Sequence, residues 1–261
     1  MALVELDWTT LGDGVALLRL NDPTRLNAMS VDMAESMREV IAQLLLKTDL
    51  RMVILTGTER AFSAGGDIEM LAKRCEVSAE QNRIFMRRYY NDFLALRTLG
   101  VPLIAAINGI TVGAASALVC ACDLRIATIT SSMSFSFVRL GLHPGMGTTW
   151  FLPSVVGVAR ATELLLTART LSSSEMIEYG LVSKVVPDQE LMNAVEELVS
   201  VILKGGTECI KQLISTLRAP SSCLNQALER ECLVQALNYS GAEFKTLLKE
   251  KIDKKPSLSK D

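Results

Sequence analysis

The pattern of hydrophobic and polar positions divides the chain into a part with strands and helices and a part with helices alone. In the first part, short apolar runs alternate with longer segments whose apolar residues recur at helical spacing. The runs that predict strands are residues 3–10, 15–20, 51–56, 103–107, 124–127 and 133–137. Strands separated by helices predict right-handed crossovers and a mainly parallel sheet. The first two runs flank a Gly-Asp-Gly turn and predict an antiparallel hairpin.

Helical spacing in this part is found at about 31–45, 79–99 and 114–122, and Ser30 stands at the N-cap position of the first of these helices. From residue 148 onward, the predicted helices are 148–156, 158–167, 172–179, 190–204, 207–217, 224–238 and 241–251, with one strand at 181–186. Ser172 and Glu175 match a capping box. We therefore expect an α/β core over residues 1–190. We expect the helical segment 191–261 to pack on a neighbouring subunit.

Two turns built from small residues each lie between a predicted strand and a helix. Residues 62–67 are Phe-Ser-Ala-Gly-Gly-Asp, and residues 113–117 are Gly-Ala-Ala-Ser-Ala. Small side chains let a ligand approach the backbone, and N–H groups at a helix start are free to bind a negative oxygen. If these turns faced each other, they would form an oxyanion hole from main chain alone.

Composition narrows the classes of partner. The formal net charge of −2 argues against nucleic acid as the main partner. A single histidine excludes a His-rich metal site, so we expect no metal. The apolar stretches are too short for a membrane span. Without a signal peptide, the six cysteines indicate reduced thiols in an intracellular, soluble protein of the cytosol or mitochondrion.

Several segments occur in a characteristic order. They are Asn21-Asp-Pro-x-x-x-Asn27-Ala-Met29, Ala61-Phe-Ser-Ala-Gly-Gly-Asp67, Pro102-Leu-Ile-Ala-Ala-Ile-Asn108-Gly109, Gly113-x-x-x-x-Leu118 with Cys122-Asp123, Leu140-Gly-Leu-x-Pro144-Gly145-x-Gly147, and Gly180-Leu-Val182. With this order and spacing, residues 3–190 resemble the crotonase superfamily, also called the enoyl-CoA hydratase/isomerase family.

The resemblance implies a crotonase-like α/β fold, a spiral of ββα units with a helical C-terminal segment. It implies acyl-CoA substrates and a role in fatty acid metabolism, with coenzyme A as part of the substrate and no separate cofactor. It implies homotrimers or dimers of trimers, with 191–261 as the trimerisation segment. By motif position, the backbone N–H groups of Gly66 and Ala114 would stabilise a thioester enolate, each contributing about 3 kcal/mol.

Further site residues follow from motif position alone. The resemblance implies that five residues surround the adenine and pantetheine of CoA, mainly through backbone: Arg25, Leu26, Ala64, Asp67 and Ile68. Arg25 could pair with a phosphate or be an exposed turn residue. Phe137 is a candidate wall of the acyl pocket.

The chain departs from the family at the acid–base positions. Family hydratases carry two glutamates, and these positions are Ala117 and Phe137 here. Family isomerases keep a carboxylate at the second position, and dienoyl-type isomerases place an aspartate where this chain has Gly145. Losing one acid–base group typically costs about 10²–10⁴-fold in rate, so we expect very weak hydration.

Two side chains are candidates for other roles. His143 could transfer a proton or could be a structural loop residue that bonds to backbone. Arg139 could bind a substrate carboxylate or form an ion pair at a subunit contact.

Three functions stay open from the sequence. The first is an enzyme that uses the oxyanion hole without standard hydration, for which decarboxylation of a 2-carboxyacyl-CoA fits best. The second is a non-catalytic acyl-CoA-binding protein. The third is a hydratase rescued by other residues.

Overall fold

The computed structural model describes residues 2–8 and 11–253. The chain divides into two compact units, Met1–Val199 and Ser200–Asp261, which are described separately. The sequence placed a boundary at residue 190, whereas the contacts divide the chain inside helix α8 (Leu191–Ile202).

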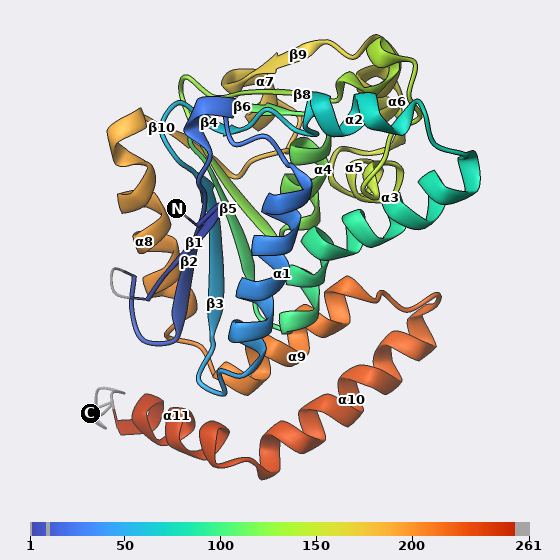
Figure 1. Cartoon of the computed structure of the whole chain (residues 1–261). Coiled ribbons are helices and arrows are strands. Elements are labelled where there is room, and N and C mark those ends of the chain that lie inside the picture. The colour runs from blue at the N-terminus through green and yellow to red at the C-terminus, as the bar shows by residue number, and fades with distance from the viewer. Residues whose placement is uncertain (1, 9–10, 254–261) are drawn as a thin grey trace. The chain divides into compact units, whose positions relative to one another are not determined.

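The first unit is built on a six-stranded sheet in the order β1-β2-β3-β5-β7-β10 (Figure 1). Its strands are β1 Val4–Asp7, β2 Val15–Leu20, β3 Met52–Gly57, β5 Leu103–Ile107, β7 Leu124–Thr128 and β10 Lys184–Val186. The pair β1–β2 is antiparallel and every other neighbouring pair is parallel, which confirms the predicted hairpin and mainly parallel sheet. Residues 9–10 of the predicted first strand lie outside the described residues.

A second, four-stranded sheet in the order β4-β6-β8-β9 was not predicted. Its strands are β4 Ala61–Ser63, β6 Ile110–Val112, β8 Ser132–Ser134 and β9 Thr170–Ser172. Three residues are too few to show the alternation that identifies a strand in sequence. The prediction of a strand over 133–137 was wrong in its second half, because β8 ends at Ser134 and a 3-10 helix runs over Ser136–Leu140.

The two sheets arise from one repeated unit. After a few residues, β3, β5 and β7 lead into β4, β6 and β8 respectively, and a helix follows. Glycines make two of these strand-to-strand connections possible. A Cβ added at Gly57 would lie 2.6 Å from the Phe62 Cα, and a Cβ added at Gly109 would lie 2.8 Å from the Arg60 carbonyl carbon. The second sheet therefore lies across one end of the first (Figure 1). This is the ββα spiral that the family resemblance implied.

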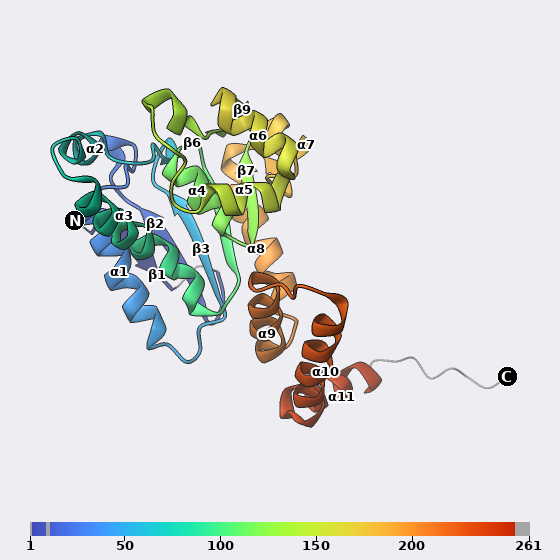
Figure 2. The same cartoon turned by 90° about the vertical axis from the view of Figure 1, so that its right-hand side faces the viewer.

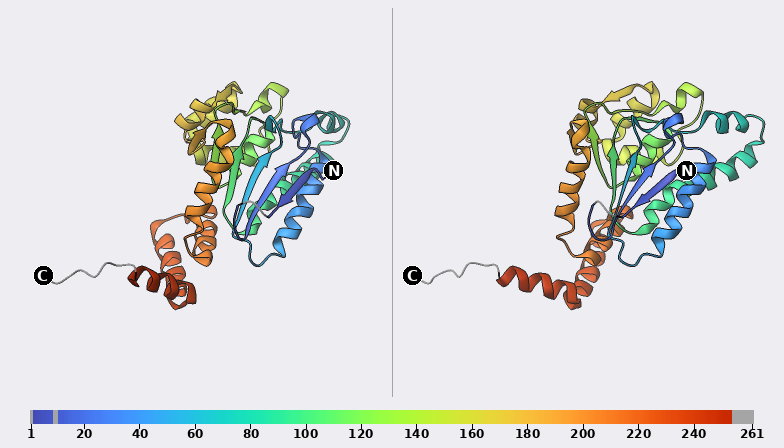
Figure 3. Two further views of the ribbon diagram at one scale, coloured as in Figure 1. Left: turned by 90° about the vertical axis from the view of Figure 1, so that its left-hand side faces the viewer. Right: turned by 60° about the vertical axis from the view of Figure 1, so that its left-hand side comes forward.

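Helices cover both faces of the large sheet. The described helices that begin in the first unit are α1 Val31–Leu45, α2 Ile68–Arg74, α3 Ala79–Leu94, α4 Ala114–Ala121, α5 Thr148–Val156, α6 Val158–Thr167, α7 Ser173–Glu178 and α8. The α1 helix begins as predicted, with Ser30 Oγ accepting the Met33 N–H at 3.1 Å. It packs on α3, on the face of the sheet opposite α8 (Figure 3), and α5 packs across α4 (Figure 2). The predicted helix 79–99 is α3 followed by a 3-10 turn, Ala95–Leu99.

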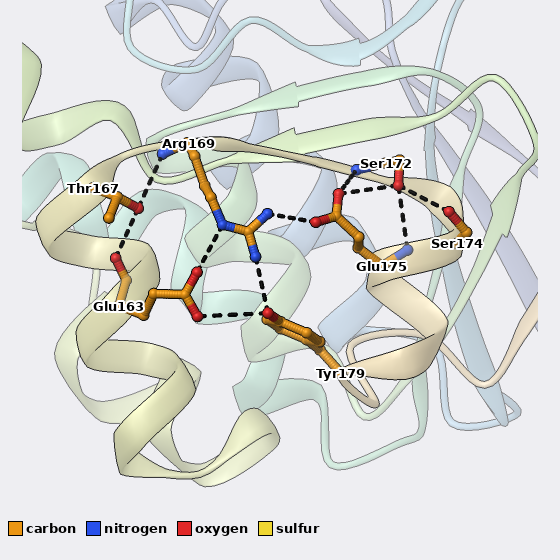
Figure 4. A network of polar contacts seen from close by, with 7 residues as sticks. All are labelled: Glu163, Thr167, Arg169, Ser172, Ser174, Glu175 and Tyr179. Carbon is orange, nitrogen blue, oxygen red and sulfur yellow. Dashed lines mark hydrogen bonds and ion pairs between the residues drawn. The ribbon is translucent and has the colours of Figure 1, made fainter.

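Arg169 links α6 to α7 outside the cavity described below (Figure 4). Its guanidinium pairs with Glu163 at 2.7 Å and with Glu175 at 2.5 Å, and it donates to the Tyr179 hydroxyl at 2.9 Å. Glu175 also completes the predicted capping box with Ser172, whose N–H donates to it at 2.9 Å. These hydrogen bonds lower the pKa of Glu175, the Ser172 N–H first and Arg169 second.

After the end of α8, the described part of the second unit contains helices α9 Thr207–Arg218, α10 Leu224–Ser240 and α11 Ala242–Asp253, as predicted within a few residues. Asn238 donates to the Gln212 side chain at 2.7 Å and ties α10 to α9. Glu243 accepts the Thr207 N–H at 2.5 Å and so caps the start of α9.

None of the helices in the described residues is long and apolar enough to cross a membrane. The same part of the chain contains no cluster of three metal-binding side chains.

Candidate functional site

The structure brings the two small-residue turns into contact. Gly65 has a φ of 85°, a left-handed conformation that favours glycine. A Cβ added at Gly65 would overlap the Val112 carbonyl group and would lie 3.5 Å from the Ala114 nitrogen. The Met29 N–H donates to the Gly65 carbonyl at 2.7 Å and holds the first turn from its other side. Only a residue without a side chain allows this approach.

Two backbone N–H groups at this junction, those of Gly66 and Ala114, donate to no protein acceptor within the described residues. Ala114 is the first residue of α4, where a helix provides no internal acceptor. The preceding residue, Gly113, donates its own N–H to the Ser134 carbonyl at 2.8 Å, which anchors the turn. Both free N–H groups belong to residues that line one cavity, so together they can bind a negative oxygen.

That cavity has a volume of about 610 Å³, which is in the range of small-ligand sites. Its walls come from the two turns, α2, α3 and residues 136–143. Most of them are apolar, and none of the described lining residues is Asp or Glu. Arg74 is the one Lys or Arg in this described lining. The site therefore offers hydrogen-bond donors and a cation, but no carboxylate base from the part of the chain that the structure describes.

Some of the predicted site residues line the cavity and others do not. Those that line it are Ala64, Gly66, Ile68, Ala114, Phe137 and His143. Those that do not line it are Arg25, Leu26, Asp67 and Ala117. Arg139 is exposed and does not line it either.

Arg25 and Asp67 stabilise the first turn. Arg25 pairs with Asp22 at 2.6 Å and with Asp67 at 3.1 Å, and the hydrogen bond with Asp22 raises the pKa of its guanidinium. Asp67 also caps α2 by accepting the Met70 N–H at 2.7 Å. The charge of Arg25 is thus already balanced by protein carboxylates.

Leu26 acts through its backbone. It has a φ of 52°, and its carbonyl accepts the Ala64 N–H at 2.8 Å. This bond ties the segment that carries Arg25 to the rim of the cavity.

The two positions that the family resemblance assigned to the hydratase glutamates lie in different surroundings. Ala117 is fully buried in α4 and is part of the hydrophobic core. Phe137 is half-buried on the 3-10 helix Ser136–Leu140 and lines the cavity with its apolar ring. Neither can move a proton.

His143 is exposed and bonds to backbone. Its Nδ1 lies 2.9 Å from the Pro144 carbonyl oxygen. Because a carbonyl can only accept, Nδ1 carries the hydrogen of this bond. The bond restrains the ring at the edge of the cavity.

Apart from Ile68, sequence reasoning missed the side chains that α2 and α3 contribute. Arg74 stacks on the Phe85 ring at 4.1 Å, and its Nε, like the Asn82 Oδ1, is buried without a hydrogen-bond partner among the described residues. Tyr89 and Tyr90 also line the cavity. At helical spacing, aromatic residues resemble core positions, so the pattern alone did not distinguish them.

The two tyrosines differ in their hydrogen bonds. The Tyr89 hydroxyl donates to the Met29 carbonyl, and burial raises its pKa. The Tyr90 hydroxyl lies against the backbone of Gly145: a Cβ added there would overlap the hydroxyl and would lie 2.8 Å from Tyr90 Cζ.

Comparisons with known proteins agree with this architecture. A family model described as enoyl-CoA hydratase/isomerase matches residues 10–251. A short-chain-enoyl-CoA hydratase of Clostridium acetobutylicum is 34% identical over 198 residues, covering 76% of this chain and 75% of that protein. The crystal structure of an enoyl-CoA hydratase from Bacillus anthracis matches with a TM-score of 0.86 and 30% identity, over 97% of this chain and 98% of that one.

A structure of a putative enoyl-CoA hydratase from Thermobifida fusca, solved in complex with acetoacetyl-CoA, matches with a TM-score of 0.83 and 30% identity, over 92% of this chain and 95% of that one. The repeated ββα units, the two facing turns and these matches lead to one conclusion. The chain belongs to the enoyl-CoA hydratase/isomerase family, the crotonase superfamily.

Proposed function

We propose that this chain binds an acyl-CoA thioester and stabilises its enolate with the N–H groups of Gly66 and Ala114. Both N–H groups lack protein acceptors in the described residues and border the same cavity. The related T. fusca protein was solved with acetoacetyl-CoA, which is such a thioester. Donors that are already oriented toward a developing negative oxygen contribute about 3 kcal/mol each to transition-state stabilisation.

The reaction we propose is one that forms the enolate without a base. The observation that carries this choice is the absence of Asp and Glu among the described residues that line the cavity. Hydration requires one group to activate water and another to protonate the α-carbon. Ala117 and Phe137 cannot supply either group.

Decarboxylation of a 2-carboxyacyl-CoA meets this condition. The bond between the α-carbon and the carboxylate breaks, CO₂ leaves, and the electron pair passes to the thioester as an enolate. No proton is removed in this step, so the oxyanion hole provides the main catalysis. Arg74, the cation of the described lining, also favours a substrate with an acyl carboxylate.

The test compares two reactions of the same purified protein. We expect CO₂ release from at least one of malonyl-CoA, methylmalonyl-CoA and ethylmalonyl-CoA, and very weak hydration of crotonyl-CoA. Robust crotonyl-CoA hydration would contradict the proposed reaction. Tight acyl-CoA binding without turnover of any thioester would instead favour the non-catalytic acyl-CoA-binding protein.

We also propose that the chain forms homotrimers or dimers of trimers. The α10 helix exposes a series of large hydrophobic side chains: Leu224, Leu228, Leu233, Leu237 and Tyr239. Exposed apolar faces of this kind are typical of contacts between subunits. Light scattering on the purified protein measures the assembly directly, and a monomer at working concentrations would contradict the proposal.

A further inference from the structure

We propose that the Tyr90 hydroxyl is the proton donor of this site and delivers its proton to the α-carbon of the thioester enolate. The inference rests on the proposed function, because an enolate formed by loss of CO₂ must be protonated before the product leaves. With no carboxylate in the described lining, the donor must be another group.

The position of Tyr90 supports this role. It belongs to α3 and lines the same cavity as Gly66 and Ala114. Its hydroxyl occupies the space that a side chain at position 145 would fill, because a Cβ added at Gly145 would overlap it. Gly145 therefore leaves room for a hydroxyl that reaches across from α3.

No hydrogen bond within the described residues uses the proton of Tyr90. The nearby Met146 N–H acts to lower the pKa of the hydroxyl, because it favours the ionised form. A hydroxyl has one hydrogen to donate besides the lone pairs that accept. Among the described residues, no protein acceptor takes this hydrogen. The same N–H would stabilise the phenolate that remains after the proton has been transferred.

The pKa of Tyr90 is also consistent with a role as proton donor. Burial raises the pKa of the Tyr90 phenol, and this effect exceeds the opposing effect of the Met146 N–H. The phenol is therefore protonated at neutral pH. In the protonation step, the Tyr90 O–H bond breaks and the enolate electron pair forms a new C–H bond between the α-carbon and this proton. Water later returns a proton to the phenolate.

Other polar groups in the lining are less suited. The Tyr89 hydroxyl already donates to the Met29 carbonyl. The Nδ1 hydrogen of His143 is directed to the Pro144 carbonyl, and the side chain is exposed. Tyr90 combines an available hydrogen with a half-buried position in the cavity.

The test is Tyr90→Phe, measured with methylmalonyl-CoA in D₂O. We expect turnover to fall by about 10²-fold or more, as is typical when a general acid is lost. We also expect the wild type to place deuterium on one face of the α-carbon and the variant to lose this preference. A merely structural role of the hydroxyl would not change the stereochemistry.

Two further variants make the result specific. Tyr179→Phe removes a phenolic hydroxyl outside the cavity and should keep both rate and stereochemistry. Gly145→Ala would press on the Tyr90 hydroxyl and should reduce turnover in the wild type, with a smaller further effect in Tyr90→Phe. Thermal melting of each variant shows whether it is folded.

The outcomes separate the two proposals. If Tyr90→Phe decarboxylates as fast and as stereospecifically as the wild type, Tyr90 is not the donor and the proposed function stands. If the wild type releases no CO₂, the second readout is exchange of the α-hydrogen of butyryl-CoA with D₂O at alkaline pH, where the ionised Tyr90 can carry out the same proton transfer in reverse. If Tyr90→Phe abolishes the exchange, the result supports Tyr90 as the proton donor but not the decarboxylation. If the variant leaves the exchange unchanged, or if the wild type shows no exchange, Tyr90 is not the donor.

Discussion

Gly65 determines how closely the two turns can approach. Its φ of 85° disfavours any other residue, and an added Cβ would overlap the Val112 carbonyl group. We expect Gly65→Ala to lower the free energy of unfolding by about 1–3 kcal/mol, the usual cost of a strained backbone conformation. The same change should weaken acyl-CoA binding, because the Gly66 and Ala114 donors would move apart.

Denaturant unfolding and calorimetric titration with an acyl-CoA measure these two effects. Gly66→Ala is the matched control for stability, because nothing lies closer than 3.7 Å to a Cβ added at Gly66. Equal unfolding free energies for the Gly65 variant and the wild type would show that the turn tolerates a side chain.

Ala117 shows why one substitution should not restore a hydratase. The side chain is fully buried in the core, where an ionised carboxylate without a partner is strongly disfavoured. We expect Ala117→Glu to melt at a lower temperature than the wild type and to gain no crotonyl-CoA hydration. Ala117→Gln separates the effect of size from that of charge. Crotonyl-CoA hydration by Ala117→Glu, at wild-type stability, would mean that position 117 reaches the substrate.

The link between α6 and α7 predicts how stability depends on acid. Since its hydrogen bonds lower the pKa of Glu175 in the folded chain, they stabilise the fold above the pKa of the unfolded state. This contribution is lost as the pH falls through the folded pKa. We expect Glu175→Gln to lower the melting temperature at pH 7 and to differ less from the wild type in acid.

Melting curves over a series of pH values measure this convergence. Glu178→Gln is the control, because the Glu178 carboxylate makes no ion pair or hydrogen bond within the described residues. A difference between Glu175→Gln and the wild type that stays constant with pH would contradict the assignment.

The sequence pattern predicted most helices and strands because local interactions between residues near in sequence determine where they begin and end. Ser30 and Ser172 begin helices by accepting backbone N–H groups three residues later, which is a local interaction. Three strands of the second sheet, β4, β6 and β9, were missed, because their pairing depends on partners far along the chain. Ser136–Leu140 was mistaken in part for a strand for the same reason.

At the scale of the whole molecule, α10 leads to a prediction about assembly. Leu228 and Leu233 are 47% and 62% exposed in the single chain. If subunits associate through this helix, changing both to aspartate should lower the mass seen by light scattering, because Asp is poorly tolerated where apolar surface is buried. Leu46→Asp is the control, since Leu46 is an exposed leucine of the first unit. An unchanged mass would place the contact elsewhere.

By itself, the sequence determined the two small-residue turns, because these follow from residue type and spacing. Through its resemblance to the family, it also implied the ββα order and the two positions without glutamate. Only the tertiary structure decided that the turns touch, that Arg25 is neutralised by Asp22 and Asp67, and that Tyr90 reaches Gly145. Arg25 and Asp67, for example, are 42 positions apart in the chain. Such separations are closed only when hydrophobic burial packs the helices onto the sheet, so no local pattern reports them.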